Sequence, residues 1–177
     1  GDRLPAELDA LEALVADEHV RGIGETGLDY YRTRDDEGKR LQKHSFAAHL
    51  AWAREHDLAV VVHDRDAHAD ILDVLAGEGA PDRVQMHCFS GDAEFARACL
   101  DRGYWLSFPG TVTFKPNEAL REALDLFDHL AGADAGKCVA VDVGGATTDV
   151  YSVANGMPTD PRTMLKGLPE PYIKRTV

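Results

Sequence analysis

Cysteine is scarce in this sequence, and the few cysteines present are not spaced as a disulfide framework or a zinc site requires. The chain of 177 residues contains Cys88, Cys99 and Cys138, and it has no C-x-x-C pair. An odd number of cysteines without such a pair favours small, buried, reduced side chains over cross-links. Because thiols stay reduced in the cytosol, we expect a cytoplasmic protein.

Long hydrophobic runs are also missing. No stretch approaches the roughly 20 apolar residues that a membrane helix needs. Residues 1–19 (GDRLPAELDALEALVADEH) are acidic and amphipathic, unlike a secretory signal peptide. Membrane association is therefore not expected.

Basic residues are too few to balance the acidic ones. The 19 lysines and arginines stand against 31 aspartates and glutamates, which gives a formal net charge of −12. Such a chain repels nucleic acids and anionic membranes unless a bound cation or a local basic patch intervenes. The charge weighs against a nonspecific DNA coat.

Apolar residues make up 44% of the sequence, enough for a sizeable core, and their spacing alternates between helical and strand periods. Strands are expected at residues 20–24, 58–62, 84–86 and 104–108, and helices around residues 8–15, 41–56, 71–75, 95–99 and 120–127. A βαβα series of this kind predicts an α/β protein with a parallel sheet, either doubly wound or part of a TIM barrel. About four units precede residue 123, and a TIM barrel has eight, so we expect a partial barrel that is not closed.

Three of the apolar runs stop on a side chain that can bind a metal. Glu25 ends the first run, His63 the second and His87 the third. The carboxyl ends of parallel strands meet at one edge of a sheet, where α/β enzymes hold their ligands. One carboxylate and two imidazoles predict a site for a divalent metal with positions left for water, and they do not distinguish Mg²⁺, Mn²⁺ and Zn²⁺.

Four short motifs follow one another along the first two thirds of the chain: GIGETGLDYYR (22–32), VVVHDRDAH (60–68), MHCFSGD (86–92) and YWLSFPGTVTFK (104–115). In order and spacing they resemble the TatD family of metal-dependent deoxyribonucleases. The resemblance implies a TIM-barrel hydrolase in residues 1–123 that cleaves DNA phosphodiester bonds, usually as a 3′-end exonuclease. It also implies that Glu25 bridges two divalent metals and that His63 and His87 complete the shell of one of them.

Two further residues are candidate substrate contacts. Arg65 could clamp a phosphate with its planar guanidinium, although a surface ion pair with Asp64 or Asp66 explains it equally well. Asp29 could orient a ligand or substrate, with a turn or helix-capping role as the simpler interpretation. His68 is expected to face solvent near a helix start.

The chain also departs from the TatD family. It contains no H-x-H pair and no late E-T-D motif, whose aspartate binds metal in the family. Only the ligands of one metal are present, so we expect any hydrolase activity to be impaired. The first and last strands of the barrel are missing as well, which predicts two open sheet edges and self-association through them.

Residues 124–177 have a different character. A Gly/Ala/Asp linker (131–137) precedes CVAVDVGGATTDVYSV (138–153), two β-rich runs joined at a double glycine that predict a hairpin. From residue 155 onward the chain is turn-rich, with four prolines. We place a domain boundary near residue 124.

The segments VAVDVGGATTDVYSV (139–153) and KGLPEPYIKRTV (166–177) resemble the GlmL/MutL proteins associated with glutamate mutase, which belong to the actin-like ATPase group. The resemblance implies that the turn between the two β-rich runs is a phosphate loop. Its candidate nucleotide-binding residues are Asp142, Gly144, Gly145, Thr147, Thr148 and Asp149. On residue pattern alone, the same D-x-G-G hairpin is an ordinary tight turn.

Three hypotheses for function follow. The first is a metal-dependent, TatD-like hydrolase with DNA as its substrate. The second is a nonenzymatic nucleotide-binding or reactivase-like accessory fragment. The third is an inert truncated chimera, because both resemblances break off before completing a site.

Overall fold

The computed structural model describes residues 3–131, 138–143, 148–153 and 173–175. The first part alternates helices and strands in this order: α1 (Leu4–Val15), β1 (Gly22–Asp29), α2 (Asp36–Glu55), β2 (Ala59–Arg65), α3 (His68–Glu78), β3 (Val84–His87), α4 (Ala93–Leu100), β4 (Trp105–Leu106), the 3-10 turn η1 (Gly110–Thr113) and α5 (Glu118–Ala131).

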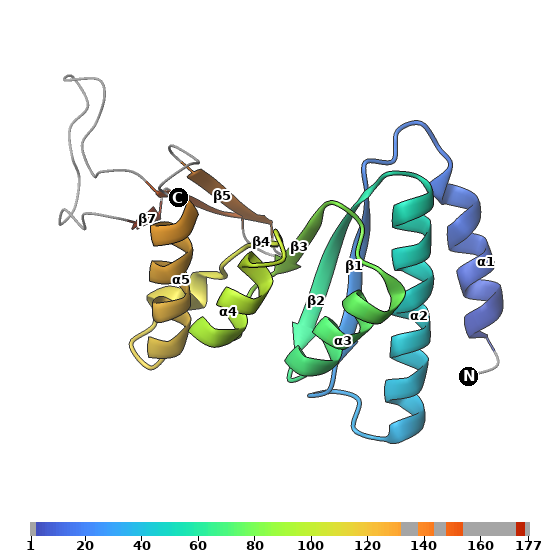
Figure 1. Cartoon of the computed structure of the whole chain (residues 1–177), viewed down its shortest axis with the longest axis horizontal. Helices are drawn as coiled ribbons and strands as arrows, with labels where there is room; N and C mark the ends of the chain where they lie inside the picture. The colour runs from blue at the N-terminus through green and yellow to red at the C-terminus, as the bar shows by residue number, and fades with distance from the viewer. Residues whose placement is uncertain (1–2, 132–137, 144–147, 154–172, 176–177) are drawn as a thin grey trace.

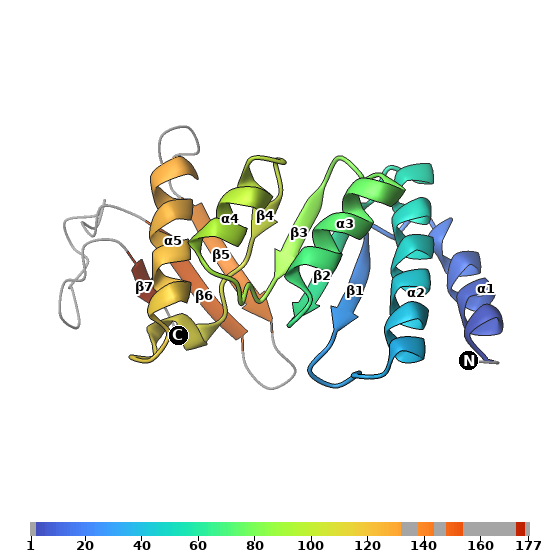
Figure 2. The same cartoon turned by 60° about the horizontal axis from the view of Figure 1, so that its bottom comes forward.

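Strands β1 to β4 form a single parallel sheet in which each strand lies beside the next one along the chain. The helices gather on one face of this sheet, and α1 packs on the outside of α2 (Figures 1 and 2). A doubly wound sheet would carry helices on both faces, whereas a barrel carries them only on its outside. The fold is therefore an α/β arc of a barrel with four strands, as the sequence predicts.

The burial pattern of β2 shows that helices cover only one face of the sheet. Val60 and Val62 point toward the helices and are fully buried, while Val61 and His63 alternate with them and stay half-exposed. The continuous apolar run at residues 58–62 therefore does not mean burial on both faces, since only alternate side chains of β2 are buried.

Local signals in the sequence account for the N-terminal ends of α2 and α4. Asp35 caps α2 by accepting a hydrogen bond from the backbone N–H of Gly38 at 2.8 Å, and Asp92 caps α4 by accepting one from Phe95 at 2.9 Å. Along α2, Phe46 and Leu50 recur at helical spacing and are fully buried. Helices α2 and α4 thus start at a polar cap, and α2 covers the sheet with an apolar stripe.

Helix α5 continues through the predicted boundary at residue 124 without a break. Its buried face includes Ala123, Leu124 and Phe127, and the ring of Phe127 lies 5.9 Å from that of Phe108, which follows β4. The core of the barrel arc therefore extends at least to Phe127. The boundary itself stays a prediction.

The second sheet is antiparallel, with β5 (Cys138–Val143) beside β6 (Thr148–Val153) and β6 beside β7 (Ile173–Arg175). The pairing of the two β-rich runs agrees with the predicted hairpin. Strand β7 was not predicted, since the chain after residue 155 had been assigned to turns. The double glycine, Gly144 and Gly145, lies outside the described residues.

Candidate metal centre

A β-bulge in β1 decides where its carboxylates point. Ile23 pairs with Val60 and Thr26 with Val62, so two residues of β1 face one residue of β2. After the bulge, Thr26 and Leu28 are buried, while Glu25 is exposed and Asp29 half-exposed. The prediction that the strand stops at residue 24 is wrong: it runs on to Asp29, and Glu25 lies within it.

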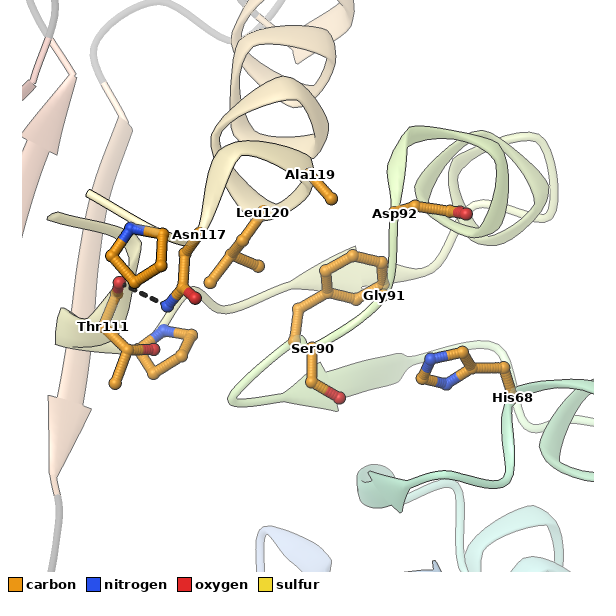
Figure 3. A pocket seen from close by; sticks show the side chains of 11 residues that line it. His68, Ser90, Gly91, Asp92, Thr111, Asn117, Ala119 and Leu120 are labelled. Carbon is orange, nitrogen blue, oxygen red and sulfur yellow. Dashed lines mark hydrogen bonds between the residues drawn. The ribbon is translucent and has the colours of Figure 1, made fainter. Parts of the chain in front are cut away.

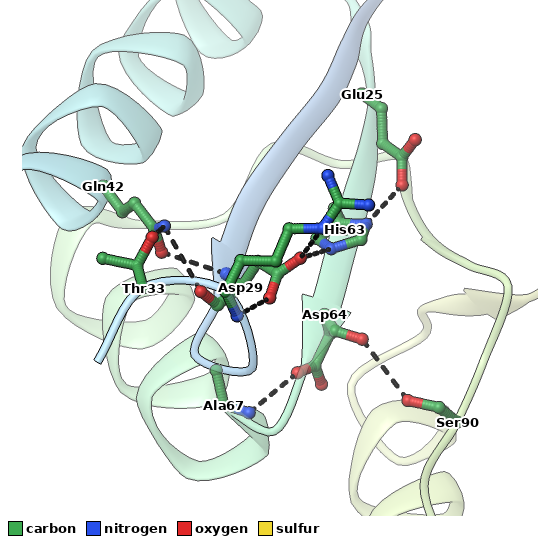
Figure 4. A network of polar contacts seen from close by, with 9 residues as sticks. Glu25, Asp29, Thr33, Gln42, His63, Asp64, Ala67 and Ser90 are labelled. Carbon is green, nitrogen blue, oxygen red and sulfur yellow. Dashed lines mark hydrogen bonds and ion pairs between the residues drawn. The ribbon is translucent and has the colours of Figure 1, made fainter. Parts of the chain in front are cut away.

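Glu25, His63 and Asp29 meet at the carboxyl end of the sheet, as Figure 4 shows. Nδ1 of His63 lies 2.7 Å from Oε1 of Glu25, and Nε2 of His63 lies 3.4 Å from Oδ2 of Asp29. Both ring nitrogens therefore face carboxylate oxygens. A neutral imidazole has one N–H and donates to only one of them, whereas an imidazolium donates to both.

His87 is adjacent to His63 in the sheet, and its ring contacts Cys88. It is the register partner of His63 on β3, so the two α-carbons are neighbours. Its Nε2 lies 3.2 Å from Sγ of Cys88. Within the described residues, no group of three or more His, Cys, Asp or Glu side chains is arranged to hold a metal ion. The structure thus joins Glu25 and His63, and it leaves His87 turned toward Cys88.

Asp29 combines the two roles that the sequence left open. Its Oδ1 accepts a hydrogen bond from the backbone N–H of Arg32 at 2.9 Å, which closes a turn, while its Oδ2 faces His63. Burial opposes ionisation of Asp29. The hydrogen bonds from Arg32 and His63, with the charges of His63 and Arg65, outweigh it and hold the pKa of Asp29 below its usual range.

Gln42 on α2 fixes the backbone of this strand end. Its Oε1 accepts from the N–H of Asp29 at 3.0 Å, and its Nε2 donates to Oγ1 of Thr33 at 2.8 Å. Glu25, Gly27, Asp29, Gln42 and His63 line one shallow hollow. Helix α2 therefore fixes the backbone of the candidate site through Gln42.

Arg65 makes a contact that the sequence did not indicate. Its guanidinium carbon lies 3.9 Å from the centre of the Tyr31 ring. Among the ion pairs of the described residues there is none between Arg65 and Asp64 or Asp66. Asp64 points instead to the helix layer, where Oδ1 accepts from the N–H of Ala67 at 3.2 Å.

His68 lies at the start of α3, as expected, but its side chain is only 37% exposed and makes two contacts that the sequence did not indicate. Its Nδ1 lies 2.6 Å from Oδ2 of Asp64, and its ring stacks on Phe95 with 4.4 Å between centroids. The hydrogen bond to Asp64 raises the pKa of His68, against desolvation, and the charges of Asp64, Asp92 and Asp66 act in the same direction. The spacing of four residues between Asp64 and His68, across a helix start, is the signal that could have revealed this pair.

His68 also borders a cavity of about 390 Å³ at the carboxyl ends of β2 to β4. Ser90, Thr111 and Asn117 line the same cavity, shown in Figure 3, and the side chain of Asn117 donates to the carbonyl of Thr111 at 2.8 Å. The loops that follow the strands of a barrel form the catalytic face in this fold. No motif or residue spacing in the sequence indicated this cavity.

The predicted nucleotide-binding residues are described only in part. Asp142 on β5 is the register partner of Asp149 on β6, and Thr148 pairs with Val143. Gly144, Gly145 and Thr147 lie outside the described residues. Their assignment to a phosphate loop stays a prediction.

A one-sided parallel sheet with carboxylate and imidazole side chains at its strand ends places the first part of this chain among the barrel-type α/β proteins. The model of the family described as TatD related DNase matches residues 2–130. The chain therefore belongs to this family.

Proteins of known sequence agree with that assignment. The chain is 45% identical, over 119 residues, to an uncharacterized metal-dependent hydrolase TatD of Mycobacterium tuberculosis, which covers 66% of this chain and 45% of the relative. It is 45% identical over 120 residues to the metal-dependent hydrolase YcfH of Escherichia coli, covering 67% and 44%. It is 37% identical over 121 residues to the 3′-5′ ssDNA/RNA exonuclease TatD of Citrobacter rodentium, covering 67% and 45%. The chain spans about half the length of the curated relatives it matches.

Solved structures give the same fold. The TatD homologue YjjV of E. coli superposes with a TM-score of 0.62 at 26% identity, over 68% of this chain and 46% of that one. A TatD-family hydrolase of Entamoeba histolytica superposes with a TM-score of 0.53 at 22% identity, over 71% and 40%, and supports the fold alone.

A second family model, described as MutL protein, matches residues 110–177. This match overlaps the TatD match through η1 and most of α5. In the part of the chain that the structure describes, no helix combines the length and the apolar character needed to cross a bilayer.

Proposed function

We propose that the barrel arc of this chain is part of a metal-dependent hydrolase that cleaves phosphodiester bonds of DNA. The observation that carries the proposal is the contact of Glu25, His63 and Asp29 at the carboxyl end of a TatD-family sheet. Relatives named as metal-dependent hydrolases, and one named as a single-strand exonuclease, support the same activity.

The donor types fit a divalent cation, but the described geometry does not assemble three of them. Carboxylate oxygens and imidazole nitrogens bind Mn²⁺ and Zn²⁺, and Mg²⁺ prefers the oxygens. Binding requires a nitrogen of His63 without its proton, and it requires His87 to turn away from Cys88. Such a cation, when bound, supplies a hydroxide-like nucleophile and neutralises charge on a phosphate.

The protein's own groups have separate tasks in this proposal. Glu25 and His63 hold the cation, with His87 as the third donor. Asp29, kept ionised and fixed by Gln42 and the Arg32 backbone, orients His63 from its other side. The H-x-H and E-T-D ligands of the family are not among the 177 residues, so we expect weak hydrolysis from this chain alone.

Metal binding and hydrolysis test the proposal together. Titration calorimetry with Mn²⁺ and with Zn²⁺ should show a site that His63→Ala and Glu25→Gln remove. The matched control is His19→Ala, because His19 also pairs with a carboxylate, Asp17, at 2.9 Å, away from the site. Release of nucleotides from single-stranded DNA should require the metal and should fall with His63→Ala. Equal metal binding by the two histidine variants contradicts the proposal.

A second candidate function rests on the MutL match and on the β5–β6 ladder, which sets Asp142 opposite Asp149. In this alternative the chain is a nonenzymatic nucleotide-binding or reactivase-like accessory fragment. Binding of Mg-ATP that Asp142→Asn abolishes and His63→Ala leaves intact supports it. If neither metal nor ATP binds and heating shows no cooperative unfolding, the third hypothesis, an inert chimera, accounts for the chain.

Self-association is part of the same proposal. Strands β1 and β4 are the edges of the parallel sheet, and unpaired edges favour pairing with another chain. Light scattering at increasing protein concentration tests it, and a concentration-independent monomer contradicts it.

A further inference from the structure

We propose that Tyr31 and Arg65 form a stacking platform for one unpaired base of a nucleic acid, next to the Glu25–His63–Asp29 site. This inference rests on the proposed function, since it assumes that the site acts on nucleic acid. It assigns a binding role to Tyr31 and changes the role of Arg65 from phosphate clamp to support of an aromatic ring.

The geometry of the pair is that of a supported aromatic surface. Tyr31 is 52% exposed, among the few large apolar side chains of the described residues that face solvent. The guanidinium of Arg65 lies over its ring at 3.9 Å, within the range of a cation–π contact. A ring held in this way has lost side-chain freedom already, so a base that stacks on it does not have to order it.

The platform adjoins the candidate metal centre through the backbone. Tyr31 follows Asp29 by two residues, and the N–H of Tyr30 donates to the carbonyl of Arg65 at 2.9 Å. This bond ties the end of β1 to the end of β2, one strand position beyond the pairing of Asp29 with Arg65. A nucleotide stacked on Tyr31 therefore has its phosphate within reach of the strand ends that carry Asp29 and His63.

Arginines lie close to the platform in spite of the net charge of −12. Arg32 and Arg34 follow Tyr31 by one and three residues, and the Nε of Arg34 donates to the carbonyl of Tyr31 at 3.4 Å. None of the ion pairs among the described residues involves Arg34 or Arg65. Neither guanidinium group lies within ion-pair distance of a carboxylate in the described part of the chain, although the charge of Arg65 acts on Asp29, so both can attract the phosphates of a bound strand.

The kind of ligand follows from the platform. A base inside a duplex is stacked on both faces by its neighbours, so only a single strand or a frayed end offers a face to Tyr31. Stacking accepts every base because each has a π-face. The platform therefore selects unpaired nucleic acid without selecting a sequence.

Binding measured without metal tests this inference separately from hydrolysis. The probes are two fluorescein-labelled eight-nucleotide single strands of equal charge, one of thymidylates and one fully abasic, titrated by anisotropy in EDTA at low salt. The full chain should bind the thymidylate strand at least about fivefold more tightly, since one stacked base contributes about 1–3 kcal/mol.

Three variants separate stacking from general weakening. Tyr31→Ala should bring the affinity for the thymidylate strand down to that for the abasic strand, and Tyr31→Phe should keep the difference. The matched control is Phe114→Ala, an aromatic exposed to a similar extent (57%) in the connection between η1 and α5. Equal affinity of the unsubstituted chain for both strands overturns the inference, as does an equal loss with Phe114→Ala.

Failure of the stacking platform and failure of the proposed function give different results. If His63→Ala leaves metal binding and hydrolysis unchanged while the preference for the base-bearing strand persists, the proposed function fails and the platform stands. If hydrolysis depends on His63 but the preference is absent, the platform fails and the proposed function stands.

Discussion

Gly27 lies directly opposite His63 in the β1–β2 ladder, so close that a methyl group added at Gly27 would stand 2.0 Å from the carbonyl oxygen of His63. Gly27 also has a backbone φ of +148°, which residues other than glycine rarely adopt. We therefore expect Gly27→Ala to lower the free energy of unfolding by about 3 kcal/mol, measured by urea denaturation.

The control for this substitution is Gly77→Ala in α3, where an added methyl group meets no atom within 4 Å. Alanine favours a helix over glycine, so this variant should gain about 0.5–1 kcal/mol. If the two variants changed stability alike, the close approach of β1 to β2 would be contradicted.

Helix α5 should stabilise the barrel arc beyond the predicted boundary. Phe127 is 7% exposed and packs against Phe108, so Phe127→Ala should cost about 3–5 kcal/mol in the unfolding of the arc, followed by the fluorescence of Trp52. Leu130→Ala, on the exposed side of the same helix, should cost less than about 0.5 kcal/mol. A folding unit that ended near residue 124 would tolerate both substitutions.

The His68–Asp64 pair should stabilise the protein more in acid than in base. Because its pKa is raised in the folded state, His68 binds its proton more tightly there than in the unfolded chain. The stabilisation is fully present below the unfolded pKa of about 6.5 and is lost as the pH rises through the folded pKa.

The measurement is the unfolding free energy of the unsubstituted chain minus that of His68→Gln, at pH 5.5 and at pH 8.5. We expect the difference to be larger at pH 5.5, by less than about 1 kcal/mol, because solvent screens a side chain that is 37% exposed. A difference that grows with pH would contradict the pairing.

Cys99 should resist modification in the folded protein. It is fully buried, and burial raises the pKa of its thiol to about 12, so almost no thiolate is present at neutral pH. In a Cys138→Ser background, a disulfide reagent should label Cys88 first and Cys99 only in urea. Mass spectrometry of the labelled peptides identifies the sites, and early labelling of Cys99 would show that α4 opens.

The sequence predicted the elements whose side chains repeat with a clear period. The spacing of Phe46 and Leu50 follows directly from burial against one layer, and the apolar run before His63 predicted a strand although only its alternate side chains are buried. Strand β1 was cut short because GIGETGLD has three glycines and no regular alternation. Its regularity comes from pairing with β2, which is a tertiary interaction and leaves no local signal.

The sequence predicted where the candidate site lies, but it did not predict how the side chains of the site are oriented. That Glu25 and His63 meet follows from parallel strands ending at one edge. The rotation of His87 toward Cys88, and of Asp64 toward His68, depends on side-chain torsions that no residue spacing encodes. Tyr31 was overlooked because an exposed aromatic in a loop has no period at all.

The bulge in β1 accommodates one extra residue without changing the faces of the strand that follows. Gly24 and Glu25 both lie opposite Val61, so removing Gly24 would leave Glu25 alone there, and Thr26 would still pair with Val62. Beyond the bulge the strand has no such tolerance, because removing Gly27 would turn Leu28 into the open and Asp29 toward the helices. A deletion of that single codon would therefore erase an acidic side chain from the site while leaving its codon in the gene.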